Sequence, residues 1–214
     1  MLDGRWKTNI EAGLKPVGRS IRRAGIRADH LTGLGIVMAT AAAVVIGNGW
    51  LTLGFVLLVA TGIPDALDGA VAKASGTTGP RGAFFDSVSD RLTDALLFGG
   101  VSWYLLSNFD GRIGLLPMAV YAAASLVSYQ RAKAEALGFE AKGGIMERAE
   151  RFVFLGFGLL FNHLLIATLW VMFALTAFTA VQRFVKVWRQ AERPPAPPRP
   201  ARPRRRERVP RTCL

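Results

Sequence analysis

The chain has 214 residues, of which 51% are hydrophobic, and it carries a formal net charge of +12. This length corresponds to about one domain. So high a hydrophobic fraction together with so large a charge argues against an ordinary soluble domain. It fits a membrane protein whose charges lie in loops and tails. The one cysteine, Cys213, excludes an intramolecular disulfide bond. We expect membrane lipids, and no nucleic acid, among the partners.

Residues 1–28 are basic, and we predict that they form an amphipathic helix at the cytosolic membrane interface. Ile10, Leu14, Val17 and Ile21 recur at spacings of four, three and four, so they share one face of a helix. A basic helix with a single apolar stripe is typical of the membrane interface. The alternative is an ordinary surface helix that packs on the body of the protein.

Six mainly apolar segments follow, and they predict an all-α bundle of six transmembrane helices over residues 29–190. Glycine-containing turns at 47–49 and 108–112 separate some of them. The third helix has a polar first half, so hydropathy alone would miss it. The expected helices cover residues 31–46, 50–68, 82–106, 113–129, 152–161 and 164–181.

The basic residues predict which side of the membrane each loop faces. Six spans put both termini on one side. If the 73–91 and 131–151 regions lie on that side too, every Lys and Arg except Arg112 lies there. Cytosolic loops carry such an excess of basic residues. We therefore expect a multi-pass plasma-membrane protein with cytosolic termini and a disordered Pro- and Arg-rich tail over 191–214, which can contact anionic lipid.

Residues 65–90 carry the strongest functional pattern. Asp65 and Asp68 lie three apart on one predicted helix, and Asp86 and Asp90 lie four apart on the next, so each pair shares a helix face. Four clustered carboxylates need cations to stay ionised, and an oxygen-only ligand set suits Mg²⁺ or Mn²⁺. The alternative is a solvated acidic helix pair, which fits poorly with the apolar flanks.

The spacing of these residues resembles the signature of the CDP-alcohol phosphotransferases. In this chain the pattern reads Asp65-x-x-Asp68-Gly69-x-x-Ala72-Lys73, then Gly82-x-x-x-Asp86-x-x-x-Asp90, and seven of its eight positions match the signature. Members of this family are integral membrane enzymes that transfer a group from a CDP-linked donor to an alcohol and release CMP. Lys73 departs from the usual arginine, which keeps the charge but loses the bidentate fork that suits a phosphate.

The resemblance implies roles for individual residues. Asp65, Asp68, Asp86 and Asp90 would bind Mg²⁺ or Mn²⁺, with two ions in each site, and Asp90 would also act as the general base. Asp94 extends the same helix face by one turn, and we expect it to line the site. The residues implied in binding the CDP moiety are Asp29, His30, Leu31, Thr32, Gly69, Lys73, Gly79 and Gly82. A simpler interpretation of Asp29 or Thr32 is helix capping.

A second resemblance concerns the acceptor. Residues 129–135 and 143–151, together with Val181-Gln182-Arg183, are similar to the bacterial phosphatidylinositol-phosphate synthases. The resemblance implies that the acceptor phosphate is bound by Lys133, Arg148, Arg151 and Arg183. These residues also fit membrane anchoring by positive charge, and Arg148 and Arg151 could pair with Glu147 and Glu150.

Together these patterns predict a homodimeric, divalent-metal-dependent enzyme. It would transfer a phosphatidyl group from CDP-diacylglycerol to inositol phosphate or another phosphorylated alcohol, and release CMP. One alternative is transfer to glycerol 3-phosphate, which gives phosphatidylglycerol phosphate. A second alternative, from another class, is a cation transporter lined by the four carboxylates. That alternative does not explain why Gly69, Ala72 and Gly82 stand at the signature spacings.

Overall fold

The computed structural model describes residue 20 and residues 28–75, 79–141 and 143–192. The side chains of Ala28, Asp65, Ala66 and residues 68–75 lie outside this description. The predicted interfacial helix, most of the basic tail and the predicted binding roles of Asp65, Asp68, Gly69 and Lys73 therefore stay predictions. The described elements are α2 (Ala28–Gly47), α3 (Leu51–Ser75), α4 (Pro80–Asn108), α5 (Leu115–Ala136), α6 (Arg148–Leu160), a 3₁₀ turn η1 (Asn162–Leu164) and α7 (Leu165–Ala191).

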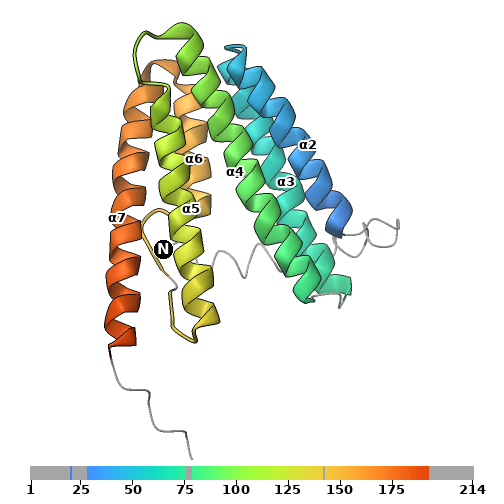
Figure 1. The fold of residues 1–214 in the computed structure, drawn as a ribbon. Helices are drawn as coiled ribbons and strands as arrows, with labels where there is room; N and C mark the ends of the chain where they lie inside the picture. Colours follow the sequence, from blue (N-terminus) through green and yellow to red (C-terminus); the bar gives the residue numbers. More distant parts are fainter. Residues whose placement is uncertain (1–19, 21–27, 76–78, 142, 193–214) are drawn as a thin grey trace, which may run out of the picture.

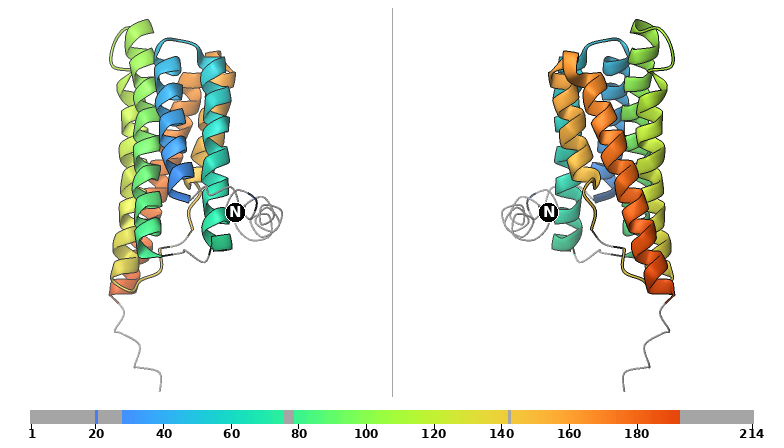
Figure 2. Two further views of the ribbon diagram at one scale, coloured as in Figure 1. Left: turned by 90° about the vertical axis from the view of Figure 1, so that its right-hand side faces the viewer. Right: turned by 90° about the vertical axis from the view of Figure 1, so that its left-hand side faces the viewer.

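The helices form an elongated bundle in which all six run roughly along one axis (Figure 1). Helix α2 packs against α3 and α4, while α5 packs against α7 and α4. Helix α6 joins the two groups, because it contacts both α3 and α7. Figure 2 shows α2 lying between α3 and α4, whose lower ends extend past the start of α2. The described residues are therefore all-helical, as the sequence predicts.

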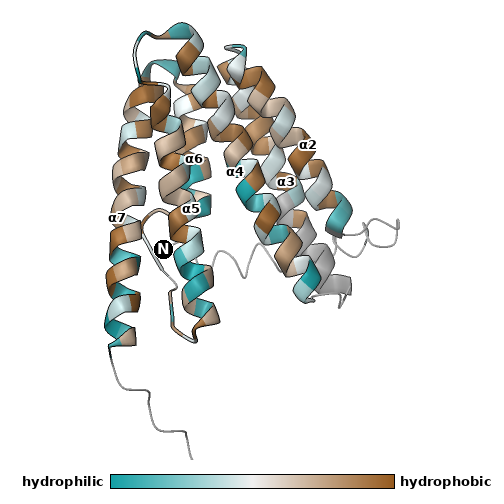
Figure 3. Cartoon of the chain, viewed as in Figure 1, coloured by the Kyte–Doolittle hydropathy of each residue, from teal (hydrophilic) through white to brown (hydrophobic). Residues whose placement is uncertain are grey.

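A continuous apolar core connects the helices. Leu97, Val101 and Leu105 of α4 are almost fully buried, and they lie at the four-residue spacing that keeps them on one face. Burying one such side chain stabilises a fold by about 1.5–3 kcal/mol. Large apolar side chains also cover much of the outer surface, and Figure 3 shows the polar residues gathered toward the lower ends of α4, α5 and α7.

Two of the described helices are long and apolar enough to cross a membrane. They cover Asp29–Gly47 and Asn162–Ala191, and a shorter apolar stretch covers Leu51–Pro64. The remaining helices of the predicted six-span bundle are also present, but α6 has only 13 residues and the apolar part of α3 covers only Leu51–Pro64. The number of membrane-crossing helices is therefore part of the proposal below.

Two predicted boundaries were wrong near the site. The sequence predicted that the second helix ends at residue 68, but α3 continues to Ser75. It also predicted a connection over 131–151, whereas α5 runs to Ala136 and α6 begins at Arg148. Hydropathy detects only the apolar part of a helix, so charged turns that prolong it were assigned to loops. As a result, Arg148 and Arg151 lie on a helix facing the core.

Gly100 marks the closest approach of α2 and α4. A Cβ atom added at Gly100 would lie 2.6 Å from the backbone oxygen of Ala43 and 2.7 Å from its Cα. Because these are backbone atoms, the two helices would have to separate to accept a side chain. Glycine at this position therefore permits the contact that places the Asp-bearing helix α4 against α2.

We expect Gly100→Ala to destabilise the fold by about 1–3 kcal/mol, the usual cost of overpacking a close contact. The measurement is the midpoint of thermal unfolding of the purified protein in detergent. Gly99→Ala is the matched control, because an added Cβ there meets nothing within 4 Å. Equal midpoints for the two variants would contradict the close helix contact.

Candidate active site

Three aspartates lie along one face of α4, and their burial increases toward the middle of the bundle. Asp86 is exposed, the side chain of Asp90 is 19% exposed and that of Asp94 is 3% exposed. The four-residue spacing places them one above the other on the helix. The acidic face of α4 therefore extends from the solvent-exposed Asp86 to the buried Asp94.

Helix geometry brings α2, α3 and α4 to this face at matching depths. Asp65 lies ten residues before the end of α3 at Ser75, and Asp90 lies ten residues after the start of α4 at Pro80. At about 1.5 Å per residue, each is about 15 Å from the short connection. Thr32 lies fifteen residues before the end of α2, and Asp65 fourteen residues after the start of α3. The first turn of α2 is therefore level with Asp65 and Asp90.

A pocket opens at this level between four helices. It brings together residues that are distant in the sequence, and it includes Asp90 and the first turns of α2 and α6. Its lining residues are Leu31, Thr32, Gly35, Thr61, Ser89, Asp90, Thr93, Arg148 and Phe152. Asp90 therefore shares the pocket with Leu31 and Thr32, two of the eight residues that were predicted to bind the CDP moiety.

Four other predicted nucleotide-binding residues are described and are not among the residues that line the pocket. Asp29 and His30 are exposed in the first turn of α2, and Asp29 lies 3.8 Å from Arg81. Gly79 and Gly82 lie at the start of α4. Thr32 is inside α2 and lines the pocket, so the capping interpretation is wrong for Thr32. The unpaired amide groups of a helix amino terminus attract phosphate, which suits the first turn of α2.

Arg148 connects α6 to the acidic face of α4. Its Nη1 atom lies 2.8 Å from Oδ1 of Asp90, and its Nε atom lies 3.7 Å from Oδ1 of Asp94. The guanidinium also lies over the ring of Phe152, 5.0 Å from the centroid. The predicted general base and a predicted phosphate-binding arginine are thus in direct contact.

Arg151 lies deeper, in a fully buried ion pair. Its side chain and that of Asp94 are each 3% exposed, and Nη2 of Arg151 is 3.1 Å from Oδ2 of Asp94. Nη1 of Arg151 also contacts the carbonyl oxygen of Met146 at 3.5 Å. The idea that Arg148 and Arg151 merely pair with glutamates nearby in sequence overlooked these carboxylates of α4.

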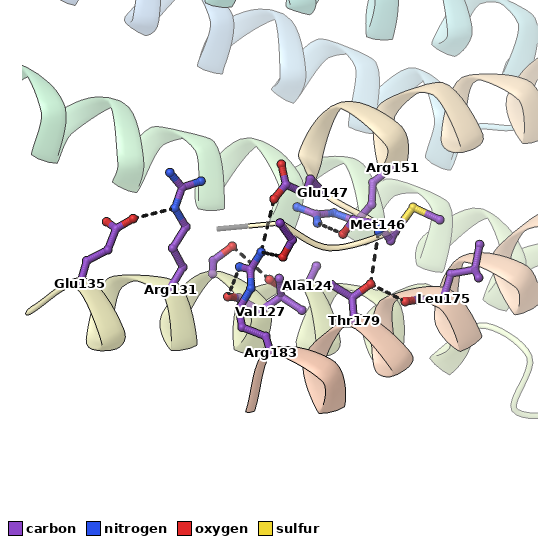
Figure 4. Close-up of polar contacts among 12 residues, drawn as sticks. Ala124, Val127, Arg131, Glu135, Met146, Glu147, Arg151, Leu175, Thr179 and Arg183 are labelled. Carbon is purple, nitrogen blue, oxygen red and sulfur yellow. Dashed lines mark hydrogen bonds and ion pairs between the residues drawn. The ribbon is translucent and has the colours of Figure 1, made fainter. Parts of the chain in front are cut away.

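Arg183 fixes the connection between α5 and α6. It donates to the carbonyl oxygens of Val127 at 2.9 Å and Gly143 at 3.1 Å, and it pairs with Glu147 at 3.4 Å (Figure 4). Its side chain is 3% exposed. Because Glu147 directly precedes Arg148, these bonds determine where α6 begins and where Arg148 points.

Two further residues of α7 bind the same connection. Thr179 accepts a hydrogen bond from the backbone N–H of Met146 at 3.2 Å. The side chain of Gln190 exchanges two hydrogen bonds with the backbone of Glu140, at 2.7 and 2.9 Å. The connection is thereby held along one face of α7. Lys133, by contrast, is exposed on the last turn of α5.

Sequence reasoning missed Ser89, Thr93, Thr61 and Phe152 as pocket residues. Ser89 and Thr93 lie four apart on α4 beside the Asp86–Asp90–Asp94 face, so helical periodicity was a usable signal for them. Thr61 is buried, and its hydroxyl donates to the carbonyl oxygen of Leu58 at 2.6 Å. No comparable spacing pointed to Thr61 or Phe152.

The donor set fits a hard divalent cation. Asp86 and Asp90 offer carboxylate oxygens, and the position beside Asp90 already accommodates the positive charge of Arg148. Among side chains that the structure describes, no group of three acidic, His or Cys residues forms a metal site. Asp65 and Asp68, the other two predicted ligands, lie on α3 with side chains outside that description.

The comparison with protein families matches the description "CDP-alcohol phosphatidyltransferase" to residues 26–188. The chain belongs to this family. The archaetidylinositol phosphate synthase of Methanothermobacter thermautotrophicus is 38% identical over 174 residues, or 78% of this chain and 86% of that protein. The phosphatidylinositol phosphate synthase of Corynebacterium glutamicum is 31% identical over 180 residues, or 80% and 82%.

The fold is also similar to a solved member. A crystal structure of Mycobacterium tuberculosis phosphatidylinositol phosphate synthase with CDP-DAG bound has a TM-score of 0.76 at 28% identity, covering 82% of this chain and 93% of that one. A second crystal structure of that enzyme, with manganese and citrate, has a TM-score of 0.77 at 29% identity, covering 82% and 88%. The predicted family and enzyme class are confirmed.

Proposed function

We propose that this phosphatidyltransferase transfers a phosphatidyl group from CDP-diacylglycerol to a hydroxyl of inositol phosphate and releases CMP. The observation that carries the proposal is the contact between Asp90 and Arg148 in one pocket. The reaction needs a carboxylate that receives the proton of the attacking hydroxyl and a cation that binds the phosphate of the same acceptor. These two groups come from α4 and α6 and meet at the first turn of α2.

In this proposal, Asp65, Asp68, Asp86 and Asp90 hold two Mg²⁺ or Mn²⁺ ions. Bound there, the cations would neutralise the charge of the diphosphate and of the departing CMP. The acceptor oxygen forms a bond to the lipid-linked phosphorus, the bond from that phosphorus to the CMP oxygen breaks, and Asp90 takes the hydroxyl proton. Asp90 is only 19% exposed, which limits competition by water.

The donor would bind at the ends of α2, α3 and α4. Leu31 and Thr32 line the pocket, Asp29 and His30 are exposed just before them on α2, and the glycines at 69, 79 and 82 would let the nucleotide approach the backbone. Lys73 would offer a point charge to the diphosphate. The positive end of the α2 dipole favours the same negatively charged group.

The acceptor phosphate would be bound first by Arg148, whose side chain is 23% exposed in the pocket. Arg151 and Arg183 are almost fully buried and contact protein acceptors, so their main contribution would be to position Arg148 and the connection before it. Lys133, on the exposed end of α5, would attract the anionic acceptor toward the site.

We also propose that α2 to α7 are six membrane spans of a plasma-membrane protein. Both termini would be cytosolic, with residues 1–28 at the interface, and the protein would be a homodimer. The distribution of Lys and Arg supports this orientation, because all but Arg112 fall on one side. Helix α6 has 13 residues, or about 20 Å, so it starts inside the bundle and brings Arg148 to the depth of Asp90.

The names of the relatives support inositol phosphate as the acceptor more strongly than they support diacylglycerol as the lipid of the donor. One is named for an archaetidyl product and the other for a phosphatidyl product, yet both names specify inositol phosphate. Family membership makes a cation transporter an unsuitable description. Glycerol 3-phosphate remains the main alternative acceptor and is included in the test.

We expect CMP release from CDP-diacylglycerol to be at least about 100-fold more efficient, in kcat/KM, with inositol phosphate than with free inositol. Two charge-assisted hydrogen bonds to a phosphate provide about that much discrimination. The measurement is CMP release by the purified enzyme with saturating Mg²⁺ across a panel of alcohols. Higher efficiency with glycerol 3-phosphate or free inositol would overturn the acceptor assignment, while the family assignment would stand.

A further inference from the structure

Asp94 is a buried charged residue outside the eight-residue signature. A carboxylate that is 3% exposed is stable only if it is paired, and its described partners are both arginines of α6. Neither ligand binding nor proton transfer has been assigned to it. Asp94 lies one turn after Asp90 along α4, so it is the buried charged residue of α4 that is nearest to the predicted base.

The four charges form an alternating series, Asp90, Arg148, Asp94 and Arg151. Arg148 contacts Asp90 closely, at 2.8 Å, and Asp94 more loosely, at 3.7 Å, which is beyond hydrogen-bonding distance. The Asp94–Arg151 pair is tighter, at 3.1 Å, and completely enclosed. Arg148 and Asp90 are thus the partly exposed members of the series, at 23% and 19%, and Arg148 is shared between two carboxylates.

We propose that Asp94 is a positioning residue that shares Arg148 with Asp90 and so keeps Asp90 accessible to a divalent cation. The proposal rests on the proposed function for its consequence in catalysis. Arg148 and a divalent cation compete for Asp90, because both neutralise the same carboxylate. The second carboxylate, Asp94, draws part of the guanidinium charge away. A phosphate on the acceptor would draw Arg148 further from Asp90.

Two substitutions should therefore change cation affinity in opposite directions. In Asp94→Asn, Asp90 becomes the stronger of the two partners for Arg148, so cation binding weakens. In Arg148→Gln, the competitor is absent, so cation binding strengthens. In the double variant, the loss of Asp94 has little further effect, because Arg148 is no longer there to be redistributed. A merely structural role of Asp94 does not predict this dependence on Arg148.

The experiment is a titration of the purified full-length protein in detergent with Mn²⁺ alone, followed by electron paramagnetic resonance. We expect Asp94→Asn to raise the Mn²⁺ dissociation constant by about tenfold and Arg148→Gln to lower it by about threefold, the scale of one partly buried charge contact. In the Arg148→Gln background, Asp94→Asn should change it by less than about twofold. Glu135→Gln, which removes an exposed charge on α5, is the control for net charge.

Equal weakening by Asp94→Asn in both backgrounds would overturn the proposal, since Asp94 would then act only through its own charge. Asp94→Glu keeps the carboxylate and should restore most of the affinity. If Asp94→Asn does not fold, Arg148→Gln still decides, because unchanged Mn²⁺ affinity in that variant would show that Arg148 and the cation do not compete.

A second readout links this result to the acceptor. Asp94→Asn should raise the KM for inositol phosphate with a smaller change in the KM for CDP-diacylglycerol, because Arg148 is held more firmly at Asp90. Equal changes in both constants would count against a positioning role toward the acceptor. If the wild-type enzyme prefers an unphosphorylated alcohol, the proposed function fails while the Mn²⁺ result is unaffected.

Discussion

Replacing Asp86 by asparagine should reduce CMP release by about 10³-fold or more while leaving a folded protein. Charge neutralisation by bound divalent cations contributes several kcal/mol to phosphoryl transfer, and each 1.36 kcal/mol corresponds to a tenfold change in rate. Asp86 is exposed near the start of α4, so the substitution removes the charge of a proposed ligand without disturbing the core. The measurement is turnover at saturating Mg²⁺. We expect the same loss for Asp65→Asn and Asp68→Asn.

Asp110→Asn is the matched control, because Asp110 is an exposed aspartate in the turn after α4, at the opposite end of that helix. Asp90→Asn separates the two roles assigned to Asp90. A general base contributes about 10²–10⁴-fold, so turnover should fall more than donor binding. If donor binding falls as steeply, Asp90 is mainly a metal ligand. Turnover close to that of the wild type in Asp86→Asn would contradict the ligand assignment.

The common face of Asp86 and Asp90 on α4 was predictable because helical periodicity is a local property. Asp86 and Asp90 share a face of α4 through their spacing alone, whatever α4 packs against. The short connection after α3 then brings Asp65 to the level of Asp90, because antiparallel neighbours keep equal residue counts at equal depth. Periodicity could not relate Leu31 and Thr32 to these aspartates, because α2 is distant from them in sequence. Only the family resemblance predicted that Leu31 and Thr32 belong to the site.

The ion pairs of the site were not predictable in this way. Which carboxylate meets Arg148 depends on where α6 begins, and that depends on three side chains of α7. Thr179, Arg183 and Gln190 bind the backbone of the connection before α6. Those bonds join residues 33 to 50 positions apart, and no periodic pattern within one segment reveals them. Hydropathy also placed the start of α6 at Phe152, because it cannot distinguish a buried charged turn from a loop.

The four basic residues that were predicted to bind the acceptor phosphate differ in their exposure to solvent. Lys133 is exposed, Arg148 lines the pocket, and Arg151 and Arg183 are each 3% exposed. A charge count along the sequence treats all four alike. Burial distinguishes the basic residues that can contact a soluble acceptor from those that stabilise the fold. Arg151 and Arg183 are therefore expected to affect stability before they affect substrate binding.

Arg151→Met should destabilise the protein by about 3–5 kcal/mol, the usual cost of leaving one partner of a buried ion pair uncompensated. Asp94 would then lose the arginine that contacts it at 3.1 Å inside the core. The measurement is thermal unfolding in detergent. The double variant Asp94→Leu/Arg151→Met should recover much of the loss, because a buried ion pair can often be replaced by apolar side chains of similar volume.

Lys186→Met is the control, because it removes a basic side chain from an exposed position on α7. Its unfolding midpoint should stay close to that of the wild type. The sequence assigned Arg151 to the acceptor phosphate, whereas its burial assigns it to the fold, and the two roles differ in what Arg151→Met changes. A wild-type unfolding midpoint with a raised KM for inositol phosphate would mean that Arg151 contacts the substrate. A large loss of stability that Asp94→Leu reverses would mean that Arg151 neutralises Asp94. Of the two arginines of α6, only Arg148 would then bind the acceptor directly.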